Sequence, residues 1–163
     1  MKRLFCLVLC TFFLVSCANV SGEPFSVFNG EFSVKISSNC EGNACDFSYN
    51  KKNETITFLS PSELVGFTLK EDKDGISLSF DGISAPVSEY AGRLLLICKY
   101  VFSASSDDVV EISARDTENG VLTLVNTDNC EYAFFSDGSP YSVCGEYEGI
   151  HFDFIFSDFE AAQ

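Results

Sequence analysis

Apolar and polar residues alternate along most of the chain, and this period of two constrains the fold more than any other feature. Successive side chains of a β-strand point to opposite faces of its sheet, so these runs predict strands with one buried face. The turn signals between them are short, so we expect antiparallel hairpins. The positions expected to be buried are Phe32, Val34 and Ile36; Phe47 and Tyr49; Ile56 and Phe58; Ile76, Leu78 and Phe80; Val110, Ile112 and Ala114; Tyr132 and Phe134; and Ile150, Phe152, Phe154 and Phe156.

Two stretches depart from this alternation. Residues 60–63, SPSE, match a capping box with proline at the first helical position, which predicts one or two turns of helix before Gly66. Residues 87–104 carry apolar residues at helical spacing, and Ser88 is a suitable N-cap. The apolar stripe of this second stretch is wide, so we expect its helix to be largely buried against the sheet.

The N-terminus has the pattern of an export signal. A basic start at residues 1–3 precedes the apolar run 4–15, which is shorter than the roughly 20 residues that span a bilayer. Residues 14–17, LVSC, then resemble the lipobox of bacterial lipoproteins, in which the signal is cut before the cysteine and that cysteine is lipidated. The resemblance implies a signal peptide at 1–16, a lipid on Cys17 and a flexible tether through residue 24. The alternative is an ordinary secretory signal in which Cys17 is incidental.

The domain that follows, residues 25–163, is acidic and long enough for one hydrophobic core. The formal net charge of the chain is −14, and loss of residues 1–16, which contain Lys2, Arg3 and no acid, takes it to −16. Such a surface repels phosphate groups and anionic lipids, which excludes nucleic acid as a partner. We therefore expect the lipid on Cys17 to hold the protein on the extracytoplasmic side of a cell membrane.

A family resemblance supports the same cellular compartment. Residues 59–69, LSPSELVGFTL, followed by residues 74–83, DGISLSFDGI, resemble envelope lipoproteins with a LolA/LolB-like half-barrel. That architecture implies a curved antiparallel sheet around short helices and an apolar cavity. The predicted fold class is therefore α+β and mostly β: a curved antiparallel sheet, or half-barrel, with one apolar helix on its concave face. The resemblance transfers no functional residue.

Loop geometry predicts one disulfide among the cysteines of this domain. If residues 136–138 form a three-residue hairpin loop, Phe135 faces Ser139, and Cys130 then faces Cys144. A cross-strand bridge would form there in an oxidising compartment. Cys40 and Cys45 flank a four-residue turn and are a second candidate pair. The alternatives are reduced thiols, or a zinc site built from all four, although the second pair is too widely spaced for a zinc knuckle.

Two further residues were considered for catalysis. Cys98 lies within the expected apolar helix, so we interpret it as a buried, inert thiol. His151 is the only histidine and lies on the strand face opposite the phenylalanine row, which favours a solvated side chain. Neither belongs to a catalytic pattern, and we expect a protein that is not an enzyme and has no cofactor or metal.

The function favoured by these features is binding of an apolar ligand, such as an acyl chain, between the phenylalanine row and the helix. In the alternative arrangement the helix fills this space and nothing binds. A second hypothesis is a scaffold for another envelope protein, such as a cell-wall hydrolase or germination factor. It would be favoured by a basic partner and by a long unprotected edge strand. The candidate cavity residues are Leu94, Ile97, Val101, Phe102, Phe152 and Phe154.

Overall fold

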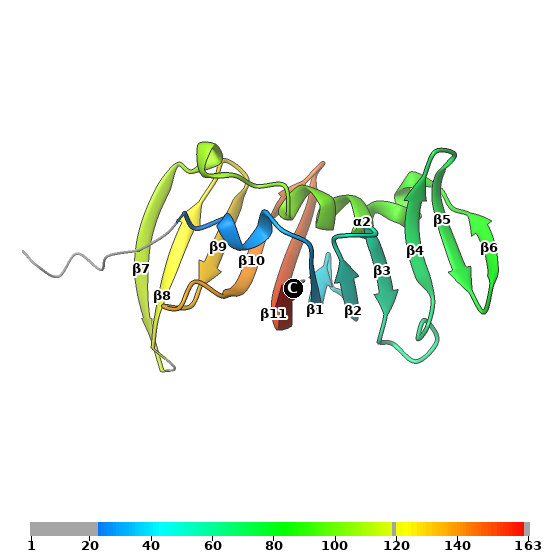
Figure 1. Cartoon of the computed structure of the whole chain (residues 1–163), viewed down its shortest axis with the longest axis horizontal. Helices are drawn as coiled ribbons and strands as arrows, with labels where there is room; N and C mark the ends of the chain where they lie inside the picture. The colour runs from blue at the N-terminus through cyan, green and yellow to red at the C-terminus, as the bar shows by residue number, and fades with distance from the viewer. Residues whose placement is uncertain (1–22, 119, 162–163) are drawn as a thin grey trace, which may run out of the picture.

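A computed structural model describes residues 23–118 and 120–161 as an open antiparallel sheet crossed by one α-helix (Figure 1). The predicted signal peptide, Cys17 and most of the predicted tether lie outside the described residues. The strands are β1 (Phe32–Cys40), β2 (Asn43–Asn50), β3 (Thr55–Phe58), β4 (Thr68–Asp72), β5 (Gly75–Phe80), β6 (Ile83–Pro86), β7 (Glu111–Thr117), β8 (Gly120–Asn126), β9 (Cys130–Phe134), β10 (Pro140–Tyr147) and β11 (Ile150–Ala161). The helices are α2 (Glu89–Val101) and the 3-10 turns η1 (Ser26–Phe28) and η2 (Ser106–Asp108).

The order of the strands explains the course of the helix. The order across the sheet is β6-β5-β4-β3-β2-β1-β11-β10-β9-β8-β7, so two meanders meet where β1 pairs with β11. The first meander ends at one edge with β6, and the second begins at the opposite edge with β7. The chain must therefore cross the whole sheet between them. Helix α2 makes about 20 Å of this crossing and contacts β4, β5 and β10 on the way. The predicted fold class is confirmed.

Tight turns of one kind join three of the hairpins. The loops Glu41-Gly42, Asp81-Gly82 and Glu148-Gly149 each contain two residues, and every φ is positive, at 48–50° for the acids and 79–83° for the glycines. Two positive φ angles are the signature of a type I′ turn, whose twist matches that of the strands it connects. The turn residues seen in the sequence thus keep these hairpins in register.

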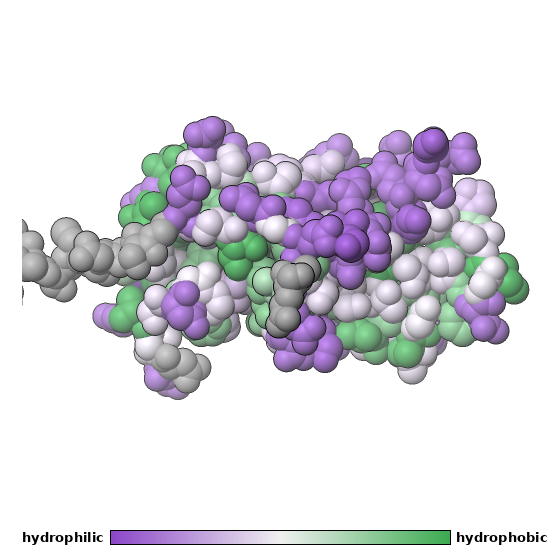
Figure 2. Space-filling model, in the orientation of Figure 1, coloured by the Kyte–Doolittle hydropathy of each residue, from purple (hydrophilic) through white to green (hydrophobic). Residues whose placement is uncertain are grey.

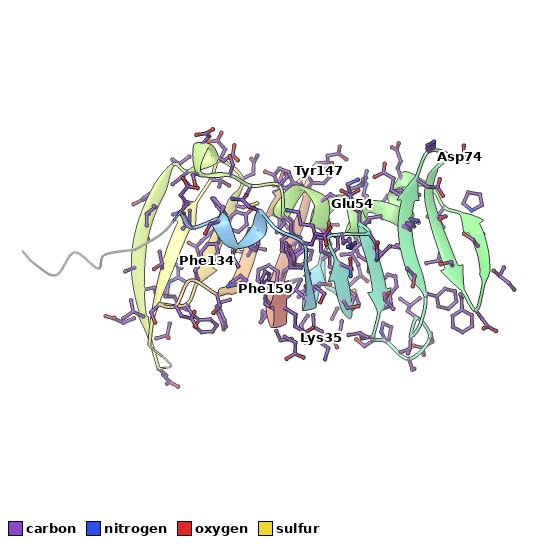
Figure 3. All side chains as sticks on the ribbon, in the orientation of Figure 1. Lys35, Glu54, Asp74, Phe134, Tyr147 and Phe159 are labelled. Atoms are coloured by element: carbon purple, nitrogen blue, oxygen red, sulfur yellow. The ribbon has the colours of Figure 1, made fainter. Side chains whose placement is uncertain are left out.

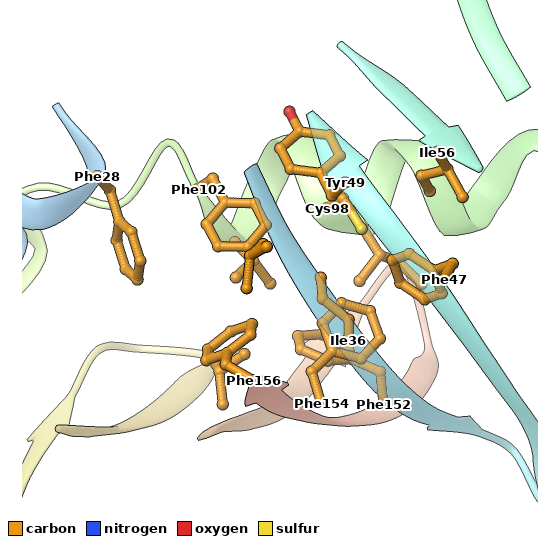
Figure 4. Packing of buried hydrophobic residues seen from close by; sticks show 14 of the residues in the cluster. Phe28, Ile36, Phe47, Tyr49, Ile56, Cys98, Phe102, Phe152, Phe154 and Phe156 are labelled. Carbon is orange, nitrogen blue, oxygen red and sulfur yellow. The ribbon is translucent and has the colours of Figure 1, made fainter. Parts of the chain in front are cut away.

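Aromatic side chains fill the concave face beneath the helix (Figure 4). Phe47, Phe154 and Ile36 from the central strands are almost fully buried, as is Cys98 from α2. Phe102 follows the helix and stacks on Tyr49 with ring centroids 5.0 Å apart and planes 13° apart. Burial of so many large side chains supplies most of the driving force for folding. The centre of the concave face is therefore a packed core.

Polar contacts fix the helix at its C-terminal end. The Tyr132 hydroxyl of β9 donates to the Val101 carbonyl at 3.0 Å. The Lys51 ammonium donates to the Phe102 carbonyl at 3.1 Å and also to the Phe28 carbonyl of η1. A cation at a helix C-terminus is favourable because the last carbonyl groups are otherwise unpaired and carry partial negative charge. These contacts bind α2 and η1 to the same region of the sheet.

An ion-pair network holds the last turn of α2 against the first meander. Lys99 contacts the carboxylates of Glu54 at 2.8 Å and Glu71 at 2.6 Å. Figure 3 labels Glu54, which lies beside the helix. Hydrogen bonds to Glu54 and then Glu71 raise the pKa of Lys99, so the lysine stays charged at neutral pH. Among the described residues, no helix is both long and apolar enough to cross a bilayer.

Both predicted helices, at residues 60–63 and 87–104, differ from the structure. Ser88 caps α2 as expected, accepting from the Ala91 N–H at 3.3 Å, but the helix is shorter than residues 87–104, and Tyr90 of its expected apolar stripe is 77% exposed. The SPSE segment forms turns and no helix. The Ser60 hydroxyl does not cap a helix there, because it donates to the Asp46 carboxylate at 2.8 Å and accepts from the Asp46 N–H at 2.9 Å.

Two strand predictions are also wrong in part. β7 forms where alternation predicts it, yet every one of its residues is exposed, including Ile112 and Ala114, and Val110 just before it is 66% exposed. Phe80, at the end of β5, is 47% exposed and stacks on Phe67 at 4.6 Å. β7 is an edge strand, whereas α2 packs on β5 at Ile76, at the opposite end of that strand from Phe80. The alternation therefore predicted the two strands correctly, but it did not predict that these side chains are exposed.

Candidate functional site

The six candidate cavity residues divide into two groups. Val101, Phe102, Phe152 and Phe154 are buried in the packed core between helix and sheet. Leu94 is half-buried, and Leu94 and Ile97 line an open cleft further along the same helix. The helix therefore fills much of the expected cavity, and accessible apolar surface remains at one end.

This cleft has a volume of about 230 Å³ and lies between α2 and the end of the β1–β2 hairpin. Its walls are mainly apolar, and its size is somewhat below the roughly 300–1,000 Å³ of typical ligand pockets. It therefore has room for part of an acyl chain or a comparably small apolar group. The residues that line it are Ser38, Cys40, Glu41, Asn43, Cys45, Tyr90, Arg93, Leu94, Ile97 and Ile150.

One cation lies at this cleft without an acidic partner. The Arg93 guanidinium stands over the Tyr90 ring, 5.0 Å from its centroid, and forms no ion pair with any of the described residues. Glu41 lines the same cleft but does not come within 4.0 Å of Arg93. A cation stacked on an aromatic ring keeps its charge available for a polar or anionic head group. The cleft thus joins an apolar wall to a charged rim.

Three thiols lie in or beside the cleft. Cys40 and Cys45 line it, and the Cys45 sulfur is 3.2 Å from the Ser38 hydroxyl oxygen. Burial raises the pKa of Cys40 to about 11, and burial likewise raises the pKa of Cys45 and of the fully buried Cys98. These thiols are therefore protonated at neutral pH and are poor nucleophiles. Cys98 is the buried thiol that the sequence predicts.

The register expected for the second cysteine pair is wrong. The loop forms as predicted, with the Phe135 N–H donating to the Ser139 carbonyl at 2.9 Å. A bulge between Pro140 and Ser142 then shifts the pairing by one residue, so Cys130 lies opposite Gly145 and Cys144 opposite Glu131. A shift of one residue turns a side chain to the other face of the sheet. Cys130 is accordingly buried on the concave side, whereas Cys144 is exposed on the convex side.

The bulge near Pro140 does not affect the other predicted disulfide, between Cys40 and Cys45. β1 and β2 pair with Cys40 opposite Asn43 and Cys45 opposite Ser38, so the two cysteines are diagonal neighbours on the concave face. All five cysteines among the described residues are free thiols. Bridging of Cys40 and Cys45 in an oxidising compartment stays a prediction. No group of three or more His, Cys, Asp or Glu side chains within the described residues is placed to hold a metal ion.

His151 is solvated on the convex face, as expected, but its surroundings were not foreseen. Its imidazole lies 3.6 Å from the Glu146 carboxylate and lines a shallow hollow with Cys144. Burial, followed by the nearby Glu131 and Asp153, raises the pKa of Cys144. A histidine and a thiol therefore lie near one another, but the acidic environment opposes the thiolate that nucleophilic catalysis requires.

Sequence reasoning missed Arg93, Tyr90 and Ile150 as cleft residues. Ile150 was expected on a buried face, and Tyr90 in the buried stripe of the helix. One signal in the sequence could have found the site: the Glu41-Gly42 turn marks the end of the β1–β2 hairpin, and Glu41 lines the cleft together with Leu94 of the helix. The position of α2 across the hairpin depends on tertiary packing that local patterns do not encode.

Several solved structures are similar to this chain at low sequence identity. They include an uncharacterized conserved protein from Thermus thermophilus, at 9% identity and a TM-score of 0.44, covering 84% of this chain and 82% of that one. A LolA superfamily protein from Nitrosomonas europaea matches at 9% identity and a TM-score of 0.42, over 88% of this chain and 95% of that one. A putative outer membrane lipoprotein-sorting protein domain from Vibrio parahaemolyticus matches at 8% identity and a TM-score of 0.33, over 82% and 86%.

These likenesses concern the fold, and function has to be argued from the residues of this chain. No family model matches the sequence, and no curated protein matches it. The structure itself shows an open antiparallel half-barrel with one helix across its concave face.

Proposed function

We propose that the chain is a lipid-anchored extracytoplasmic lipoprotein whose domain, residues 25–163, binds an apolar ligand such as an acyl chain and performs no catalysis. The cleft between α2 and the β1–β2 hairpin carries this proposal, because the half-buried Leu94 keeps apolar surface open there, above the buried Ile97, while the rest of the concave centre is packed. The lipobox-like LVSC sequence at residues 14–17 supports the anchor.

The ligand enters from the open side of the cleft, with its apolar end on α2 and its polar end near Arg93. A volume of about 230 Å³ holds only part of a long acyl chain, so the remaining carbons extend across the rim. Burial of apolar ligand surface supplies the binding free energy, at roughly 25 cal/mol per Å² of area removed from water.

Native mass spectrometry tests this proposal on a chain that begins at Ser21, purified without denaturation. That chain keeps the described sheet, its helix and both hydrophobic clusters. We expect extra mass that organic extraction removes, and loss of that mass when Leu94→Trp fills the cleft. Ile155→Trp is the matched control, because Ile155 is apolar, 47% exposed and on the convex face. A bare protein mass together with failure to bind a fluorescent fatty acid would rule out the carrier function.

The anchor is tested separately in cells that make the full chain. We expect Cys17→Ala to abolish incorporation of labelled palmitate and to release the protein from the membrane fraction. Unchanged labelling of this variant would place the lipid elsewhere or contradict lipidation.

One observation favours the second candidate, a scaffold for another protein. β7 is a seven-residue edge strand with no covering element on its outer side in the described structure, and such edges accept added strands.

A further inference from the structure

The two edges of the sheet differ in how open they are to another strand. β6 has four residues and ends in Pro86, which lacks the N–H that strand pairing uses. β7 has seven residues, none of them proline, and all are exposed. Short strands and prolines protect an edge, so β7 is the edge that can accept a partner.

Apolar side chains gather beside this edge on the concave face. Val110, Ile112 and Val121 are 66%, 48% and 46% exposed, and Figure 2 shows apolar surface at the β7 end of the molecule. The convex face of the same strand carries Glu111 and Arg115. Arg115 contacts Glu131 at 3.3 Å but is still 58% exposed, so its guanidinium has donors to spare.

We propose that a second copy of this chain pairs with β7, antiparallel and centred on Ser113. In this register Glu111 of each copy lies opposite Arg115 of the other, which forms two symmetric pairs of opposite charge. Ile112 lies opposite Ala114 of the second copy, so these two side chains cover one another, whereas Val110, just before the strand, lies opposite Asp116. A two-fold axis through the Ser113 pair makes the interface self-complementary.

Charge selects this register over its neighbours. Shifts of two residues keep the same faces together, but both remove the two Glu111–Arg115 pairs. One shift places Ile112 opposite Asp116 of the second copy, and the other places Ile112 opposite Ile112 but leaves no pair of opposite charges within the strand. Opposite charges across a strand pair contribute about 0.2–1 kcal/mol each, and like charges cost a similar amount. Only the register centred on Ser113 combines two charge pairs with an apolar contact for Ile112.

The resulting dimer is weak. Pairing of one strand from each copy buries less than the roughly 1,200 Å² of a stable interface, and two chains of net charge −14 repel each other at long range. The interaction is therefore reversible and concentration-dependent. It does not depend on occupancy of the cleft, since α2 and the β1–β2 hairpin lie away from β7 in the sheet.

Disulfide trapping tests the register in the full-length chain within cells. Every variant carries Cys144→Ser, which removes the exposed native thiol. Ser113→Cys should give a dimer after mild oxidation, because the two copies of this residue face each other. Thr117→Cys, on the same strand but opposite residue 109 of the second copy, is the matched control. We expect at least about five-fold more dimer for Ser113→Cys than for Thr117→Cys, since Cβ atoms of directly opposed residues are close enough to bridge.

Exchange of the two charged residues provides a second test of the register. In the Ser113→Cys chain, E111R and R115E should each lower the trapped dimer about five-fold, and the double variant E111R/R115E should restore it. Thermal unfolding of each variant checks that the domain still folds. Equal trapping at residues 113 and 117, failure of the double variant to restore the dimer, or a trapped product with the mass of a different protein would each overturn the proposal.

Discussion

The centre of the concave face and its β7–β8 end have the same alternating sequence but different coverage. In the centre, α2 and η1 lie over the sheet, and inward residues such as Phe154 and Val34 are completely buried. At the β7–β8 end, inward residues such as Ile112 and Val121 stay exposed. Alternation therefore predicts which face a residue points to, whereas a second layer decides whether that face is buried.

On the convex face, it is the β8–β9 end of the sheet that carries buried apolar residues. Leu122 and Leu124 of β8, with Ala133 of β9, are buried on the outer side, and Tyr141 packs against them. This end of the sheet thus has its small apolar cluster on the side away from the helix. The difference shows that the protein has one stable central core and a second, smaller cluster on the opposite face, near the edge.

The largest effect is expected in the centre. Phe154→Ala should lower the free energy of unfolding by about 3–5 kcal/mol, because it removes a completely buried aromatic side chain and leaves a cavity. Chemical denaturation followed by circular dichroism measures this. Ile155→Ala, on the neighbouring exposed position, should change stability far less. Similar losses for both variants would contradict the assignment of faces in β11.

Gly145 lies in β10, between the central strands and the β7–β8 end of the sheet, so a substitution there tests the packing where these two regions meet. A Cβ atom at this position would lie 2.4 Å from the Asn129 carbonyl oxygen and 2.7 Å from the Cys130 sulfur. Gly145→Ala should therefore lower the free energy of unfolding by about 1–3 kcal/mol, as overpacking does. Gly30→Ala is the control, because nothing lies within 4 Å of a Cβ there. An unaffected melting temperature for Gly145→Ala would mean that Cys130 does not face Gly145.

Alkaline pH should weaken the packed side of the cleft. The pKa of Cys40 is about 11 in the folded protein and ordinarily 9.0, so above pH 9 the folded state retains a proton that the unfolded state loses. The free energy of unfolding must then fall as the pH rises from about 9 to 11. Cys40→Ala should flatten this fall and leave the profile below pH 8 unchanged. Denaturation at a series of pH values measures it, and identical slopes in both proteins would show that Cys40 is not buried.

The smallest effect is expected at the uncovered end. Ile112→Ser should change the free energy of unfolding by no more than about 0.5 kcal/mol, because the side chain is already 48% exposed. The same substitution at Ile36, which is completely covered, should cost several times as much. Dilute protein is required, so that association through β7 does not contribute. A large loss for Ile112→Ser in the monomer would indicate that another element covers β7.

The sequence predicted most of the strands and the main helix, because alternation and the Ser88 cap are local features, but none of the alternating runs corresponded to β4, β6 or β8. It failed where distant residues decide the outcome. The hydroxyl of Ser60 binds Asp46, 14 positions away, so no capping box forms. One bulge near Pro140 moved Cys130 away from Cys144. The cleft was anticipated only through Leu94 and Ile97, since the rest of its wall depends on how α2 crosses the β1–β2 hairpin.

The pairing of β1 with β11 has a consequence for how the protein is made. These two strands form the middle of the sheet, yet one comes near the start of the domain and the other at its end. During synthesis the two meanders can form local hairpins, but the central seam stays open until residues up to Ala161 have emerged. High sequence separation between paired strands slows folding. A nascent chain therefore remains unfinished, and open to chaperones and proteases, until its last strand is free.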